Sequence, residues 1–273
     1  MVYGIAQILT RIFDLAVAPF GNNQAAALSA LSLVTGVAMI FVFKAVSDQK
    51  RIKASREKFK ARILEMRIYQ DDLLLIHKAL FKALATNVEY LRLSFVPIVV
   101  LVSIVFVIFV QLDERYGRGH LEPGERAMLT VTLKEGLDPV TAPIKLVAGD
   151  GMALDSAPVR WSAERQISWR IRPIVPGSHE VTIEALDKSW TLPIAAERSN
   201  AAIGHHRTTG AFNPLLYPSL PKIPKDSPIQ SVELRYPAAD YPLFIWRTHW
   251  LVVFVVFSFI GALIPKFIFR IEI

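Results

Sequence analysis

Three long apolar runs dominate this sequence. They cover residues 25–46, 93–112 and 244–264, and the charges that they contain, at Lys44 and Arg247, stand near their ends. A helix of about 20 residues is long enough to cross a hydrocarbon layer of about 30 Å. Because lipid offers the backbone no hydrogen-bonding partner, such runs are expected to be helical in a bilayer. The sequence therefore predicts an α-helical membrane protein with three transmembrane helices.

The charge is distributed unevenly along the chain. Residues 44–92 hold 12 Lys/Arg against 6 Asp/Glu, whereas residues 113–245 hold 15 against 16. A nucleic-acid binder would be basic throughout, so no nucleic-acid partner is expected. The positive-inside rule predicts that 47–90 is cytoplasmic, with the N-terminus outside and the C-terminus in the cytoplasm. The chain has no cysteine and no Asn-x-Ser/Thr site, which favours a bacterial inner membrane.

The first 21 residues predict an amphipathic helix that lies in the membrane interface. At 100° per residue one face is apolar and the opposite face is polar. The helix is expected to end near Pro19 and Gly21. The apolar face holds Val2, Ile5, Ile8, Leu9, Ile12, Phe13 and Ala16.

Residues 47–90 predict an antiparallel helical hairpin or short coiled coil, continuous with both flanking spans. Its apolar residues recur at helical spacing, and Asp71 or Asp72 can cap the second arm. The first arm is strongly basic and is expected to contact anionic lipid or a protein partner. The apolar positions are Ile52, Phe59, Ile63, Met66, Leu73, Ile76, Leu80 and Leu84. The candidate contact residues are Lys50, Arg51, Lys53, Arg56 and Phe59.

Residues 113–200 predict an all-β extracytoplasmic domain. Apolar and polar residues alternate at 128–133, 167–172, 179–185 and 190–194, and turn residues separate these runs. The pattern suggests an immunoglobulin-like sandwich whose core contains the tryptophans Trp161, Trp169 and Trp190. Residues 201–243 hold seven prolines and predict an extended linker, in which 231–236 can add one more strand.

The order of these segments resembles the core of the Oxa/YidC membrane insertase superfamily, in particular its three-span members, the archaeal YidC-like proteins and subunit three of the ER membrane complex. The resemblance covers residues 1–112 and 244–273. Its short sequence echo around 47–70 begins Ser47-Asp48-Gln49-Lys50-Arg51-Ile52-Lys53. It implies a hydrophilic groove, open to cytoplasm and lipid, through which short polar segments cross the bilayer, and a cytoplasmic hairpin that receives substrates. The extracytoplasmic domain is an insertion into that core.

Small, weakly polar residues on the first and third spans have two interpretations. They can line a groove, or they can let two helices pack closely, and packing is the simpler one. Arg92 would stand at the cytoplasmic mouth of a groove, although an interfacial anchor is its ordinary role. The groove candidates are Ser29, Ser32, Thr35, Arg92 and Ser258.

No catalytic signature is present, and no enzyme activity, cofactor or metal site is expected. The leading hypothesis is a factor that assists the insertion or assembly of membrane proteins, with nascent or partner membrane proteins and the lipid bilayer as its partners. The alternative is a scaffold or accessory subunit of a membrane complex, whose β-domain binds an extracytoplasmic protein. A third hypothesis is an anchored sandwich that binds envelope polysaccharide or peptide.

Overall fold

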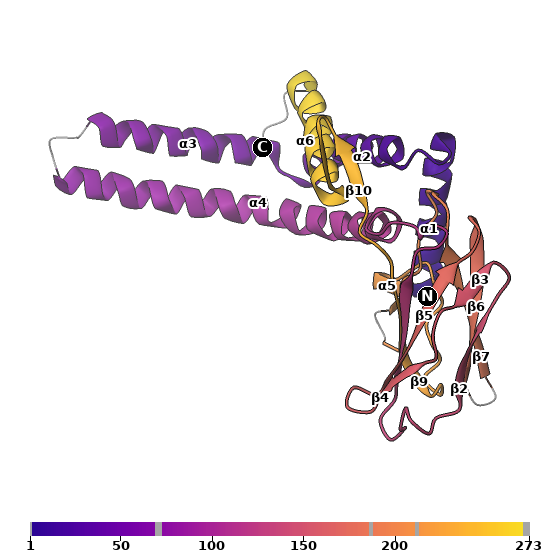
Figure 1. Cartoon of the computed structure of the whole chain (residues 1–273). Coiled ribbons are helices and arrows are strands. Elements are labelled where there is room, and N and C mark those ends of the chain that lie inside the picture. Colours follow the sequence, from indigo (N-terminus) through magenta and orange to yellow (C-terminus); the bar gives the residue numbers. More distant parts are fainter. Residues whose placement is uncertain (1, 69–72, 186–187, 211–212, 270–273) are drawn as a thin grey trace. The chain divides into compact units, whose positions relative to one another are not determined.

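The computed structural model describes residues 2–68, 73–185, 188–210 and 213–269 (Figure 1). These residues form two compact units. One unit combines Met1–Ser29 with Val107–Val253 and contains the strands. The other combines Ala30–Phe106 with Phe254–Ile273 and is helical.

Three helices are long and apolar enough to cross a membrane, as predicted. They are α2 (Gln24–Val46), the apolar part of α4 (Leu73–Tyr116) and α6 (Trp250–Phe269). The helix α6 begins six residues after the expected start of the third run at Phe244, because the intervening residues pair in a β-hairpin. The predicted N-terminal helix is α1 (Val2–Val17), followed by a 3-10 turn, η1 (Ala18–Phe20).

The helix α3 (Gln49–Ile68) runs antiparallel to the first half of α4 (Figure 1). The Oγ of Ser55 donates to the carbonyl of Thr86 over 3.4 Å, and Glu65 lies 3.9 Å from Lys82. Asp48 begins α3, since its carboxylate accepts the backbone N–H of Arg51 over 3.1 Å. The second arm is continuous with its span, whereas residues 47–48 separate the first arm from α2.

The contact face of this hairpin differs from the predicted one. Ile52 and Ala83 are buried and Phe59 is half-buried, but Ile63, Leu80 and Leu84 are exposed. The side chains of Met66, Leu73 and Ile76 lie outside the described part of the structure, as do Asp71 and Asp72. Small residues at the contact bring the arms together, and the larger apolar residues of α4 therefore face outward.

Two antiparallel sheets and a separate hairpin form the β-structure. The larger sheet has the order β3-β5-β1-β9-β8, and β4 also pairs with β5. The smaller sheet has the order β2-β6-β7, and β10 pairs with β11. The bounds are β1 (Ala127–Leu133), β2 (Ile144–Ala148), β3 (Met152–Leu154), β4 (Val159–Trp161), β5 (Gln166–Pro173), β6 (Ser178–Ala185), β7 (Lys188–Ala195), β8 (His206–Thr208), β9 (Ile229–Arg235), β10 (Asp240–Leu243) and β11 (Trp246–His249).

One hydrophobic core joins the two larger sheets. In β1, Leu129, Val131 and Leu133 are fully buried while their neighbours are not, as the alternation predicts. Trp169 and Trp190 lie in this core. Trp161, in contrast, is more than half exposed, because it lies on the short strand β4, which pairs only with β5 among the described strands.

The proline-rich stretch 201–243 contributes to these sheets. Its strand β9 occupies the position of the predicted extra strand and pairs with β1, with Val232 opposite Val131. It also supplies β8, β10 and the short helix α5 (Asn213–Leu216). Proline is tolerated there because the prolines stand between the strands or, like Pro242, in a two-stranded ribbon.

Candidate functional site

The basic arm of the hairpin, defined as Lys50, Arg51, Lys53 and Arg56 on α3, exposes all four cations. Further along α3, Arg62 pairs with Glu65 over 2.7 Å, and this hydrogen bond lowers the pKa of Glu65. The basic arm therefore presents cations at the surface, as the sequence predicts, while acidic residues nearer the turn are matched by local ion pairs. Such a surface attracts anionic headgroups or acidic protein segments.

Phe59, the remaining candidate on α3, lies in a shallow hollow between the two arms. Arg56, Phe59, Asn87 and Tyr90 line this space, whose volume is about 290 Å³. The hollow combines one cation, one amide and two aromatic rings. It brings together two of the predicted contact residues, Arg56 and Phe59, with two residues of α4 that the sequence did not single out.

An apolar stripe on α4 lies outside the contact with α3. It consists of Leu80, Phe81, Leu84, Val88 and Leu91, all exposed. The spacing of three and four residues places these side chains on one helical face. Ala83 and Ser94, which are buried, lie on a different face of α4. A soluble helix would not leave so many large apolar residues in water, so this surface is suited to contact apolar segments.

Arg92 follows this stripe directly and is exposed. It is thus placed where the basic hairpin meets the apolar part of α4. This position is compatible with an interfacial anchor and with the mouth of a groove, the two roles that the sequence suggests for Arg92.

The small residues of α2 and α6 meet at a close helix crossing. A Cβ on Gly36 would lie 1.9 Å from the carbonyl oxygen of Ser258, and one on Gly261 would lie 2.3 Å from that of Leu33. The backbones therefore touch at these two glycines. Further along, the rings of Phe41 and Phe269 are 5.4 Å apart, so the C-terminal ends of both helices lie together.

The groove candidates on these two helices differ in their burial. Ser32 and Thr35 are buried, whereas Ser29 and Ser258 are half-buried. The hydroxyl of Ser258 donates to the carbonyl of Val255 over 3.1 Å within its own helix. Close packing therefore accounts for Ser32 and Thr35, in agreement with the simpler of the two interpretations.

A buried arginine that the sequence did not single out connects α1 to the end of α4. The side chain of Arg115 is fully buried and forms an ion pair with Asp14. It also donates to the carbonyl of Thr10 over 3.0 Å and to the Oε1 of Gln111 over 2.8 Å, and it lies over the ring of Phe13. We call these residues the anchor cluster. Thr10 and Phe13 are half-buried at this contact, and Ala6 and Val17 of α1 are buried.

Part of the apolar face of α1 remains uncovered. Ile8, Ile12 and Leu15 are exposed, whereas Leu9 and Phe13 are half-buried. The sequence contained one signal for this arrangement, since Arg115 follows an apolar run and α1 carries an acidic residue on its polar face.

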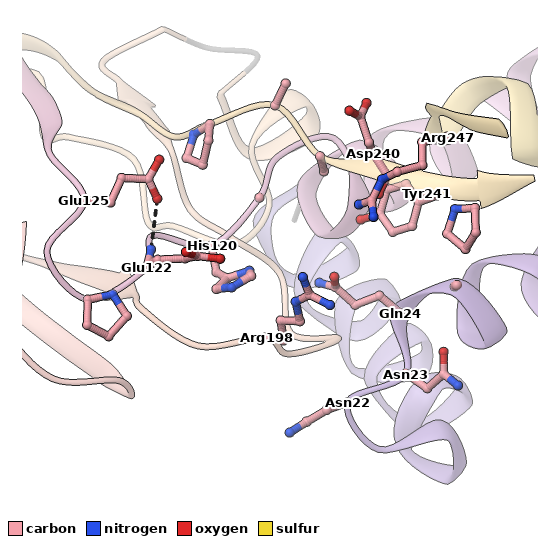
Figure 2. A pocket seen from close by; sticks show the side chains of 17 residues that line it. Asn22, Asn23, Gln24, His120, Glu122, Glu125, Arg198, Asp240, Tyr241 and Arg247 are labelled. Atoms are coloured by element: carbon pink, nitrogen blue, oxygen red, sulfur yellow. Dashed lines mark hydrogen bonds between the residues drawn. The ribbon is translucent and has the colours of Figure 1, made fainter.

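A polar pocket of about 850 Å³ lies in the unit that contains the strands (Figure 2). Its wall includes the residues just before α2, the 119–125 segment and the base of the β10–β11 hairpin. Arg198 and Arg247 line it together with Glu122, Glu125 and Asp240. Gln24 points toward the pocket, and its amide donates to the carbonyl of Ser199 over 2.8 Å. Because both signs of charge line the pocket, it lacks the single-sign field that concentrates one kind of charged ligand.

A buried polar contact joins the end of α4 to the residue that precedes β8. The Nδ1 of His205 lies 3.5 Å from the Oε1 of Glu114, and both side chains are buried. Burial is the main cause that lowers the pKa of His205 to about 4, and the nearby charge of Arg118 acts in the same direction. The imidazole is therefore neutral at pH 7.

Comparisons with known proteins add little to this picture. No protein-family model and no curated protein matches the chain. Among solved structures, the crystal structure of the S-layer protein SbsC domains 4 and 5 matches with 16% sequence identity and a TM-score of 0.23. The match covers 29% of this chain and 47% of that chain, an overlap too small to carry an argument about fold or function.

Proposed function

We propose that this chain is an integral membrane protein that assists the insertion or assembly of other membrane proteins, with a core of the Oxa/YidC type. Three apolar helices, a basic hairpin between the first two and an amphipathic N-terminal helix support this proposal. The observation that carries it is the exposed apolar stripe on α4, which lies on the same hairpin as the basic arm.

In this proposal the hairpin is cytoplasmic and α2, α4 and α6 cross a bacterial inner membrane. The uneven charge supports this orientation, as does the contact between the C-terminal ends of α2 and α6. The β-structure would then be extracytoplasmic. Its two sheets around one core are compatible with an immunoglobulin-like sandwich.

The mechanism that we propose is passive. The apolar stripe would hold an apolar segment of a substrate before it enters the bilayer, and the cations of the basic arm would hold the hairpin near anionic lipid. Polar groups that cross lipid cost several kcal/mol each unless partners replace the lost hydrogen bonds. Binding at the hairpin lowers the barrier only by presenting the segment at the correct place, so no covalent step is involved.

Photocrosslinking in cells tests the proposal. A photoreactive amino acid at Val88, on the apolar stripe, is expected to capture many newly made membrane proteins, and the same probe at Val159 on β4 is not. Capture that does not decay when protein synthesis is stopped would argue against transient substrates.

Charged variants give a second readout. Leu84→Glu places a charge on the apolar stripe and is expected to reduce the capture of nascent chains by the Val88 probe. Ala85→Glu adds the same charge to an exposed position outside the stripe and is the matched control. Equal capture by the two variants would show that the stripe is not the receiving surface.

An accessory subunit of a membrane complex is the second candidate, and the close crossing of α2 and α6 favours it. Helices whose backbones touch leave no polar channel between them at that point. In this case the probe at Val88 would capture one stable protein, in constant amount, whether or not protein synthesis continues.

A further inference from the structure

The hairpin formed by β10 and β11 carries an apolar tip. Phe244, Ile245 and Trp246 are consecutive, and their exposed fractions are 81%, 85% and 70%. The sequence alone predicted these residues as the beginning of a membrane span. Phe244 and Ile245 instead form the turn of a hairpin that precedes the span, and Trp246 begins β11, so three large apolar side chains lie outside a helix.

The base of this hairpin is well packed. Tyr241 and Leu243 on β10 are buried, and the ring of Tyr241 meets that of Tyr116 edge-on at 5.9 Å. Arg247 donates to the carbonyl of Asp240 over 3.0 Å across the two strands. The tip is therefore held by an ordered ribbon, and its exposure results from the direction of the hairpin.

The backbone at the tip also has a conformation that is unusual for its residue. Phe244 has a φ of +54°, in the left-handed region, where a residue with a Cβ is less stable by about 1–2 kcal/mol. A turn that only reversed the chain in water would favour Gly or Asn at this position. The side chain of Phe244 is 81% exposed, so packing among the described residues does little to offset this cost.

Chain connectivity limits what that contact can be. β11 has four residues and is followed directly by α6. At about 3.3 Å per residue, the tip lies within about 13 Å of the first residue of α6. If α6 crosses the bilayer, as the proposed function requires, the tip cannot leave the neighbourhood of the membrane surface. The polar interfacial layer there is about 5–8 Å thick on each side.

We infer that Phe244, Ile245 and Trp246 insert into the interfacial region of the bilayer on the side of the β-structure. Tryptophan and phenylalanine suit this region, because it offers apolar contact below and water or headgroups above. Arg247, the next residue, does not take part in this insertion, since its side chain is held at the base of the hairpin by its hydrogen bond to the carbonyl of Asp240. The hairpin is thus a second lipid contact of this unit, besides the exposed face of α1, and it restrains how the β-structure tilts over the membrane.

The absence of cysteine makes a direct test possible, because a single introduced cysteine is the only labelling site. Ile245→Cys and, as control, Val159→Cys on β4 are labelled with an environment-sensitive fluorophore. The full-length protein is then reconstituted in vesicles of phosphatidylethanolamine and phosphatidylglycerol. Both positions are exposed, so neither label should disturb the fold.

The label at position 245 is expected to emit at shorter wavelength than it does in water. Lipids that carry a quencher near the headgroup should reduce this emission, and iodide in the buffer should not. The label at position 159 should respond to iodide alone. Equal quenching of both labels by iodide would place the tip in water and overturn the inference. Protection of position 245 from both quenchers would overturn it as well, since a protein surface would then cover the tip.

Failure of the proposed function is distinguishable from failure of this inference. Alkaline carbonate extraction of the same vesicles reports whether the chain spans the bilayer. A chain that is extracted contradicts the membrane-spanning arrangement itself, whereas a chain that stays in the membrane with position 245 in water contradicts only the role of the tip.

Discussion

A single buried cation holds the N-terminal helix in place. Arg115 at the end of α4 binds the carboxylate of Asp14 and the carbonyl of Thr10, so it contacts α1 at two points one turn apart. A buried arginine without partners would be very unfavourable, and the four polar atoms around it are what make its position possible. Ile8, Ile12 and Leu15 of α1 stay exposed, and a membrane interface would cover them.

Replacing Arg115 by glutamine should release α1. Hydrogen bonds to a charged group contribute about 1.5–3 kcal/mol each to stability. Because Asp14 is half-exposed, we expect the contribution of the Arg115–Asp14 contact to lie at the lower end of this range. Limited proteolysis should cut the Arg115→Gln protein near residue 11 at a protease concentration that leaves the parent intact. Gln7→Ala, at an exposed position of the same helix away from the cleavage site, is the control. Identical cleavage of Arg115→Gln and the parent would contradict the role of the anchor cluster.

His205 should make stability depend on pH. Its pKa in the folded chain, about 4, is below its ordinary value of 6.5, so the unfolded chain binds the proton first. The contribution of His205 to stability should therefore fall as the pH decreases from about 6.5 to about 4. Glu114 beside it acts in the opposite direction over the same range, because burial raises the pKa of its carboxyl to about 7.

Denaturation of the protein in detergent micelles, followed by tryptophan fluorescence across this pH range, measures the effect. His205→Gln removes only the histidine contribution, so the stability of this variant relative to the parent should rise as the pH falls, while His77→Gln, at an exposed histidine of α4, should follow the parent. Parallel profiles for the parent and His205→Gln would show that the imidazole is not the group responsible.

At the scale of elements, backbone contact decides how α2 and α6 are associated. Neither glycine at the crossing has room for a methyl group, because the neighbouring atom is a backbone carbonyl that cannot rotate away. Lipid provides no hydrophobic driving force between helices, so this close approach is itself a main source of their association.

Gly36→Ala should therefore separate the two helices and cost about 1–3 kcal/mol, despite the higher helix propensity of alanine. The thermal midpoint of the purified protein in detergent measures the loss. Gly4→Ala is the matched control, since a Cβ there meets no neighbour within 4 Å. A midpoint for Gly36→Ala at or above that of the control would mean that the crossing is looser than the structure indicates.

At the scale of the whole molecule, each unit has its own chemistry. The unit with the sheets contains the anchor cluster, the polar pocket and the apolar hairpin tip. The helical unit contains the basic arm and the apolar stripe. The net positive charge of residues 44–92 belongs to the second unit, and the positive-inside rule therefore predicts that its hairpin is cytoplasmic.

Labelling of single cysteines in intact spheroplasts tests this topology. Val159→Cys should react with a membrane-impermeant maleimide, whereas Lys58→Cys on α3 should react only after the cells are lysed. Both positions are exposed, so access to solvent is the same once the membrane is broken. The opposite pattern would invert the proposed orientation, and reaction of both positions in intact spheroplasts would exclude it.

The sequence by itself determined the kinds of element and their order. Apolar length predicts the three long helices, and alternation predicts the main strands, including β9, because both patterns depend on residues that are close in the chain. The charge distribution predicts an orientation for the same reason. The basic arm and Phe59 were identified as surface candidates on α3 without any knowledge of its partner.

Which side chains meet depends on the tertiary fold. Arg115 is an anchor, Gly36 lies at a helix crossing, and the apolar stripe of α4 faces outward, because each outcome depends on residues far away in sequence. The residues 244–246 show the same limit. Their hydrophobicity fits the start of a span, but the pairing of β10 with β11, a contact that apolarity does not encode, places them in a hairpin before the helix begins.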